Sequence, residues 1–232
     1  MTEMLVNSQF FGIALTLVLF FAAFALKVKL NNNPFVNPVI ISSAAIILVL
    51  VILKVPYESY NASAGFLSFL LTPATVCLAI PLYRQFGILK KNWRCVLISV
   101  AVGTLFSITS VLAVTFLMHL DRQHVITLLP KSVTAAIGVG LSEENGGFAT
   151  LTLITIILTG AVGNTFGPQI LKLFRVKEPV SQGLALGTAT HAIGTSKALE
   201  LGEVQGAMSS LSLVIAGIIT TALMPIMIRI FL

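Results

Sequence analysis

A polar stretch interrupts an otherwise apolar chain near its C-terminus. The segment LALGTATHAIGTSKALELGE, residues 184–203, contains hydroxyl, imidazole, ammonium and carboxylate groups. Polar and ionisable groups are costly inside a membrane and are candidates for function by default. Hydroxyl groups can donate hydrogen bonds to an anion, and glycine lets the backbone approach a ligand closely. The residues of this stretch that we predict to bind substrate are Thr188, Thr190, His191, Gly194 and Thr195.

Three ionisable residues of this stretch suggest more specific roles. Histidine titrates near neutral pH, so His191 is the predicted carrier of a co-transported proton. The alternative is a histidine that only satisfies a contact between helices. Lys197 and Glu200 are three residues apart, a spacing that places both on one helix face. We therefore predict a structural ion pair between them.

A second polar stretch, residues 128–146, offers a positive charge. Lys131 follows Pro130, with Ser132, Thr134 and Gly138 close behind. This order predicts the start of a half-helix, where free backbone N–H groups and a lysine attract an anion. Alternatively, Lys131 extends its ammonium to the membrane interface. All four of these residues after Pro130 are included in the predicted substrate site.

Asn164 is the remaining candidate for substrate binding. It lies among small residues in GAVGNTFG, residues 160–167, inside a long apolar run. Its amide predicts one of two roles, lining a cavity or tying two helices together.

The two polar stretches resemble each other. TAAIG at 134–138 and THAIG at 190–194 match in four of five positions, 56 residues apart. A weaker similarity relates residues 70–81 to residues 128–138, with Pro73 and Pro130 57 apart. Inverted repeats with interrupted segments near the membrane midplane are typical of secondary transporters. The alternative is that both stretches are small-residue faces for helix packing.

Composition indicates the elements that must position these residues. Of 232 residues, 56% are hydrophobic and 9% charged, with a mean hydropathy of +1.00. Soluble domains carry about 25% charged residues, so the chain is predicted to be an integral membrane protein. The fold class is an all-α polytopic membrane protein, with about six full transmembrane helices plus two re-entrant or broken-helix segments, 128–146 and 181–204. The apolar runs are 9–26, 35–53, 95–118, 148–171 and 207–231, with a sixth, 66–83, interrupted by Pro73 and Pro81.

We expect one integral membrane domain over residues 1–232, with N-terminal helices to residue 94 and a core over 95–232. Basic residues follow the first, third and fifth of the six runs in chain order, and cytoplasmic loops carry an excess of lysine and arginine. This rule places the N-terminus outside. It also makes 128–146 a hairpin entering from outside and 181–204 one entering from the cytoplasm. Such backbone persists at membrane depth only where protein or a water-filled cavity covers it.

The sequence contains no pattern of an enzyme. Paired histidines, a cysteine cluster, a phosphate-binding loop and a nucleophile elbow are all missing from it. Cys77 and Cys95 are isolated and fit neither a disulfide nor a metal site. We therefore expect no enzyme activity, no cofactor and no metal. The net charge of +6 mostly reflects basic loops, so no nucleic-acid partner is expected.

A family resemblance adds to this interpretation. The motifs that carry it are NPFVNP (33–38), TPATVCLAIPLY (72–83), LLPKSVTAAIG (128–138), LTGAVGNTFGP (159–168) and GLALGTATHAIGTSKALELGEVQGAMSSL (183–211). In this order they resemble the LrgB/CidB family of antiholin-like membrane proteins, from about residue 33 to the C-terminus. The resemblance implies a multi-pass protein of the bacterial cell membrane. The motifs do not separate an LrgB-type from a CidB-type member.

The resemblance implies two functions. One is transport of small monocarboxylates such as pyruvate or glycolate, since relatives include a plastid glycolate/glycerate carrier. The other is antiholin-like regulation of murein hydrolase activity, autolysis and cell death through a holin-like partner. A small LrgA/CidA-type membrane protein, a small anionic substrate, membrane lipids and further copies of the chain are the expected partners. Two opposed re-entrant segments favour the carrier, because a protein that only docks to another has no need of them.

Overall fold

The chain forms two compact units in a computed structural model that describes residues 8, 10–30, 36–70, 73, 76–77 and 79–231. Unit 1 is Met1–Cys77 and unit 2 is Leu78–Leu232. The sequence predicts one integral membrane domain over residues 1–232, with N-terminal helices to residue 94 and a core over 95–232. Residues 79–94 lie in unit 2, because α6 (Ala79–Arg84) packs against α12 (Glu203–Phe231) and α7 (Phe86–Leu117) continues unbroken through residue 94.

The secondary structure confirms an all-α polytopic membrane protein. No strand occurs among the residues that the structure describes. Four helices there are long and apolar enough to cross a membrane: α2 (Phe11–Lys29), most of α7, α10 (Ala149–Leu173) and α12. The apolar α3 (Pro38–Ile52) is shorter. The interrupted run 66–83 covers the end of α4 (Tyr57–Phe69) and nearly all of α6. Residues 71–72, 74–75 and 78, between these helices, lie outside the described residues.

Unit 1 contains α2, α3 and α4. The backbone N–H of Gly12 donates to Ser63 Oγ at 2.9 Å, and the hydroxyls of Thr16 and Tyr60 lie 2.8 Å apart, so polar contacts join α2 to α4. At the start of α3, Asn37 Oδ1 accepts from the N–H of the second helical residue at 2.9 Å. A side-chain acceptor there satisfies one of the free donors of a helix start.

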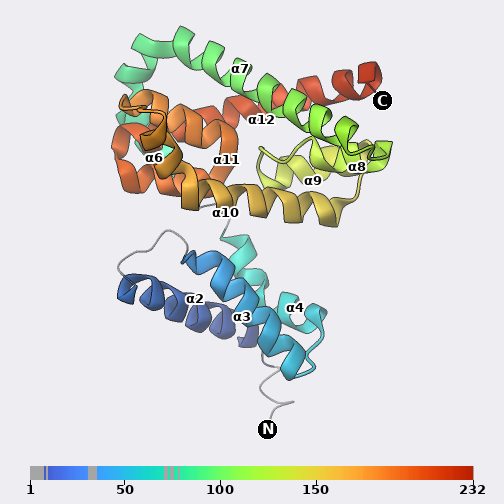
Figure 1. The fold of residues 1–232 in the computed structure, drawn as a ribbon. Coiled ribbons are helices and arrows are strands. Elements are labelled where there is room, and N and C mark those ends of the chain that lie inside the picture. Colours follow the sequence, from blue (N-terminus) through green and yellow to red (C-terminus); the bar gives the residue numbers. More distant parts are fainter. Residues whose placement is uncertain are drawn as a thin grey trace. The chain divides into compact units, whose positions relative to one another are not determined.

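Unit 2 contains two hairpins, and each of them returns to the end of the unit at which it began (Figure 1). The first hairpin, residues 122–144, is α8 (Arg122–Leu128) and α9 (Ala135–Glu144), joined by a short turn. The second hairpin, residues 179–201, is α11 (Pro179–Leu201), which is broken by non-helical backbone at Thr190 (φ −135°, ψ 18°) and His191 (φ 44°, ψ −139°). A long apolar helix follows each hairpin, α10 after the first and α12 after the second. Unit 2 therefore contains two helical hairpins, each followed by a long apolar helix.

The backbone repeats with the period of the sequence motifs. α7 and α10 are each followed by a residue in the left-handed region, His119 (φ 54°) and Arg175 (φ 56°), which are 56 positions apart. Such residues commonly end helices. α8 and α11 begin 57 positions apart, at 122 and 179. Pro168 inside α10 and Pro225 inside α12 are also 57 apart. Helix ends, helix starts and helix prolines thus recur together, as in an internal duplication.

The duplication is inverted. In Figure 1, α10 runs in the direction opposite to α7 and α12, so the hairpins that follow α7 and α10 enter unit 2 from opposite ends. Both interruptions fall at the start of the shared motif. Thr134 is extended (φ −65°, ψ 151°) directly before α9, and the second half of α11 begins after His191. The shared threonine marks the start of each new helix, whereas Gly138 and Gly194 lie inside the helices that follow.

The two hairpins are predicted to be accessible from opposite sides of the membrane. Gln123 and Lys177 are exposed at the entrances of the first and second hairpin. With Cys77 and Cys95 replaced, we expect Gln123→Cys to react with an impermeant thiol reagent on intact cells. Lys177→Cys should react only after permeabilisation, because basic loops remain cytoplasmic. Labelling of both positions from the same side would contradict the inverted arrangement.

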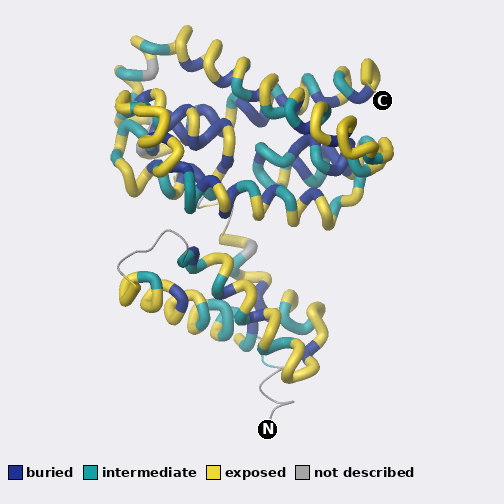
Figure 2. Tube along the Cα trace, viewed as in Figure 1, coloured by how far each residue is buried: buried dark blue, intermediate teal, exposed yellow. Residues whose placement is uncertain are grey.

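The second hairpin is covered by protein. Figure 2 shows buried residues along α11 and along the neighbouring parts of α10 and α12. Thr188, Thr190, His191 and Thr195 are all buried there. A helix break exposes backbone polar groups, which are tolerated at membrane depth only when other protein segments or water surround them. The packing of α11 meets that condition.

Candidate functional site

A cavity of about 590 Å³ lies where both hairpins meet α7. The first hairpin contributes the turn before α9, and the second contributes the half of α11 that precedes its break. One face of α7 forms the remaining wall. The residues that line it are Ser99, Val102, Gly103, Phe106, Ser107, Ser110, Lys131, Ser132, Ser181, Leu184, Ala185, Thr188 and Ala189.

Lys131 is the only charged residue among the described residues lining this cavity. Its Nζ donates to Ser132 Oγ at 3.1 Å and lies 3.4 Å from Ser107 Oγ. The two serine hydroxyls are 2.9 Å apart. Within the described part of the chain, Lys131 forms no ion pair. A half-buried ammonium with neutral hydroxyl neighbours and no acidic partner is suited to bind an anion.

The donors at this site are side chains rather than a helix start. The backbone N–H of Lys131 donates to the Leu128 carbonyl at 3.2 Å, and that of Val133 donates to the Pro130 carbonyl at 3.3 Å. These groups are used in the turn of the first hairpin, and α9 begins only at Ala135. The sequence predicted free backbone N–H groups beside Lys131. Those of Lys131 and Val133 are instead hydrogen-bonded within the turn. The lysine ammonium and the hydroxyls remain for an anion.

The sequence analysis missed the contribution of α7. Ser99, Gly103, Ser107 and Ser110 are spaced i, i+4, i+8 and i+11, which places them on one face of the helix. All four line the cavity. The spacing of small polar residues in an apolar helix was a usable signal, since such faces mark close helix contacts or polar paths. Ser181, at the start of α11, was missed as well.

The predicted site residues divide into two groups. Lys131, Ser132 and Thr188 meet at the cavity. The others lie outside it, and most of them pack in the contacts of α9 and α11 with their neighbouring helices. These others are Thr134, Gly138, Asn164, Thr190, His191, Gly194 and Thr195.

The break in the second hairpin is held by hydrogen bonds to its neighbours. His191 Nε2 donates to the Ile156 carbonyl of α10 at 3.0 Å, so the ring faces α10 rather than the cavity. Thr190 Oγ1 donates to the Leu186 carbonyl at 2.7 Å. Thr195 Oγ1 donates to the His191 carbonyl at 2.9 Å and lies 2.9 Å from the hydroxyl of Ser209 in α12. These contacts fix the position of the tip.

In the first hairpin, Thr134 and Gly138 are the counterparts of Thr190 and Gly194 in the repeated motif. A Cβ on Gly138 would approach Ile156 Cδ1 to 2.5 Å and the Pro130 carbonyl to 3.2 Å, so only glycine fits without displacement. Thr134 is the half-buried residue before α9 and makes no side-chain cap hydrogen bond. The glycine therefore serves close packing of α9 on α10.

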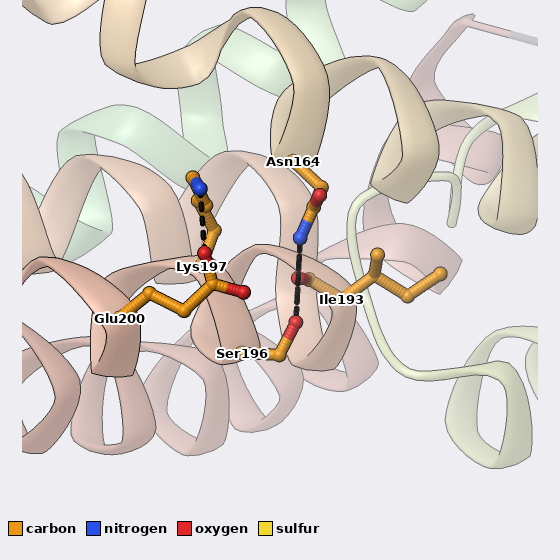
Figure 3. A network of polar contacts seen from close by, with 5 residues as sticks. All are labelled: Asn164, Ile193, Ser196, Lys197 and Glu200. Atoms are coloured by element: carbon orange, nitrogen blue, oxygen red, sulfur yellow. Dashed lines mark hydrogen bonds and ion pairs between the residues drawn. The ribbon is translucent and has the colours of Figure 1, made fainter. Parts of the chain in front are cut away.

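Asn164 ties two helices together (Figure 3). From α10, its Nδ2 donates to the Ile193 carbonyl at 3.0 Å and to Ser196 Oγ at 3.3 Å. In the same view, Lys197 Nζ and Glu200 Oε2 lie 2.6 Å apart and form an ion pair on α11. Both contacts stabilise the second half of the second hairpin.

A further cavity of about 410 Å³ lies between the C-terminal part of α7, α8 and the end of α12. Apolar side chains and two threonines line it, and it contains no charged residue in the described part of the chain. It therefore offers nothing to compensate an anion. No group of three His, Cys, Asp or Glu side chains suited to a metal occurs among the residues described.

Comparison with known families connects this geometry to a protein class. The sequence model of the LrgB-like family matches residues 16–230, nearly the whole chain. The chain belongs to the LrgB-like family. The matched range of this LrgB-like protein includes both hairpins, α7 and every residue that lines the 590 Å³ cavity around Lys131, hereafter the Lys131 cavity. No solved structure matches the LrgB-like fold described here.

Proposed function

We propose that this LrgB-like protein is a carrier subunit for small monocarboxylates of the pyruvate or glycolate type. The observation that carries the proposal is Lys131, which has no acidic partner among the described residues and lies in a cavity formed by both hairpins and α7. A carboxylate must exchange its hydration for fixed donors inside a membrane, because an unpaired buried charge is very costly. Lys131 supplies the charge, and neighbouring hydroxyls supply neutral donors.

The composition of the cavity supports a small monoanion. One ammonium balances one carboxylate. The remaining lining combines serine and threonine hydroxyls with Val102, Phe106 and Leu184, so it accommodates a short carbon skeleton beside the carboxylate. A second carboxylate would find no second cation among the described lining residues. Dicarboxylates are therefore expected to be poor substrates.

The inverted hairpins also support transport. Secondary transporters commonly place their substrate site where inverted repeats with interrupted helices meet. Here Ser132 of the first hairpin and Thr188 of the second are 56 residues apart, the spacing of the repeat, and both line the cavity. One pair of equivalent positions from the two oppositely directed hairpins therefore contributes to the site.

Proton coupling through His191 stays a prediction from the sequence. The ring is buried at the break and bonds to the Ile156 carbonyl. Protonation there would act on the position of the hairpin tip rather than on the substrate directly. The expected holin-like partner and further copies of the chain likewise belong to the proposal.

The proposal is tested by uptake of labelled pyruvate into proteoliposomes that contain the full chain. We expect saturable uptake down a pyruvate gradient, with stronger inhibition by unlabelled glycolate than by succinate. The measurement is repeated with a small LrgA-like protein co-reconstituted, since a separate partner is part of the proposed system. Folded protein that takes up no pyruvate in either preparation would contradict the carrier. It would favour the antiholin-like regulator, which acts only by binding its partner.

A further inference from the structure

The hydroxyl of Thr104 is buried without a hydrogen-bond partner. Thr104 lies in α7 and is 4% exposed. It is the one residue with such an orphaned side-chain atom in the part of the chain that the structure describes. Thr109 and Thr115, on the same helix, donate to the carbonyls four residues earlier at 2.8 Å each. Leaving a buried hydroxyl unpaired lowers stability, so the exception at Thr104 needs an explanation.

Thr104 borders a second, much smaller space beside the Lys131 cavity. This space measures about 10 Å³. Three residues line both spaces, namely Ser107, Ser132 and Thr188. Thr104 and Thr220 add two further hydroxyl-bearing side chains, and the remaining lining is apolar. The unpaired hydroxyl is thus part of a small polar subsite that adjoins the proposed carboxylate site.

The size of this subsite limits what it can hold. A water molecule needs roughly 10–15 Å³ of such volume, so one oxygen atom fits and an entire carboxylic acid does not. A substrate whose carboxylate binds Lys131 therefore remains in the larger cavity. Ser107 contacts Lys131 and lies three residues from Thr104, about one helical turn away. Only a second oxygen close to the carboxylate can reach both groups.

We propose that Thr104 is a specificity-determining residue that binds the oxygen on carbon 2 of a 2-oxo or 2-hydroxy monocarboxylate. A hydroxyl can donate to a 2-oxo oxygen and accept from a 2-hydroxy group, so both substrate types satisfy Thr104. An unsubstituted acid leaves the threonine hydroxyl unpaired. The site then discriminates against that acid through the cost of the unpaired group. This inference rests on the proposed carrier function and assigns a residue that determines its specificity.

The test compares acids that share a three-carbon skeleton. Pyruvate, lactate and propionate compete for labelled pyruvate uptake in proteoliposomes containing wild-type protein or Thr104→Val, which keeps the side-chain shape. In wild type, pyruvate and lactate should compete better than propionate. In Thr104→Val this preference should fall about tenfold, the size expected for one hydrogen bond to a buried group, while inhibition by propionate stays unchanged.

Two variants and a stability measurement make the result decisive. Thr104→Ser should retain the preference, and Thr115→Val, which removes a hydroxyl already paired within α7, should leave it at the wild-type value. Because Thr104→Val removes an unpaired group, its thermal denaturation midpoint in detergent should equal or exceed that of wild type. An unchanged preference in Thr104→Val, or an equal loss for all three acids as expected for a bound water only, would overturn the inference. Wild-type protein that takes up no acid would overturn the carrier function, and the inference with it.

Discussion

Lys131→Gln is expected to raise the pyruvate concentration for half-maximal uptake by roughly 10- to 150-fold. The variant keeps a hydrogen-bonding side chain and removes the one positive charge among the described residues of the cavity. Hydrogen bonds to charged groups contribute about 1.5–3 kcal/mol, and 1.4 kcal/mol corresponds to a factor of ten in binding. The measurement is the substrate dependence of initial uptake in proteoliposomes.

Two controls separate charge from folding. Lys131→Arg retains the charge and should recover much of the affinity, although its planar, larger head group fits the serines less well. Lys197→Gln removes a lysine from the second hairpin whose partner is Glu200 and which lies outside the cavity. It should transport with wild-type affinity. Equal affinities for wild type and Lys131→Gln would mean that the ammonium does not bind substrate.

Gly194→Ala is expected to damage the second hairpin. An alanine Cβ there would lie 2.9 Å from the carbonyl oxygen of Leu186, which precedes the helix break, and 2.9 Å from Cβ of Thr190, which lies in the break. Overpacking of this kind costs about 1–3 kcal/mol, and each kcal/mol lowers the denaturation midpoint by about 2–4 °C in a chain of this size. Uptake should fall in parallel, because Thr188 precedes the same break and lines the cavity.

Gly140→Ala provides the matched comparison. Gly140 is also a helical glycine after a hairpin interruption, but no heavy atom lies within 4 Å of the position that a Cβ would occupy there. Alanine favours a helix over glycine by up to about 1 kcal/mol, so this variant should be as stable as wild type or more stable. If both alanine variants denature at the wild-type temperature, Gly194 is not required for close packing.

The two hairpins could be predicted because two independent signals agree. The motifs at 134–138 and 190–194 repeat, and the basic loops place them on opposite membrane faces. The structure adds that each interruption falls at the shared threonine. The glycines of the motif do not lie at the interruptions. They lie instead in the following helices, because the backbone turns before the motif's alanine–isoleucine pair and the glycines permit close contact afterwards.

The composition of the cavity could be predicted only in part. Lys131, Ser132 and Thr188 stand out as polar residues in their segments, so the sequence identifies them. Ser107 and Thr104 lie in a long apolar helix about 25 residues before Lys131, and hydroxyls are common in such helices. Their meaning depends on which face of α7 the hairpins approach. His191 stands out in the sequence as an ionisable residue in a polar motif, yet it does not line the cavity. Its ring hydrogen-bonds to the Ile156 carbonyl outside it.

The break at Thr190 and His191 has a consequence for biogenesis. A lone segment with non-helical backbone is unfavourable in the lipid hydrocarbon, because its free N–H and C=O groups would have no hydrogen-bond partners there. The segment becomes tolerable once other helices surround it. α12, which packs extensively on α11, is made after it. We therefore expect the second hairpin to take its final place in the membrane only after α12 has been synthesised, so that its entry depends on tertiary packing.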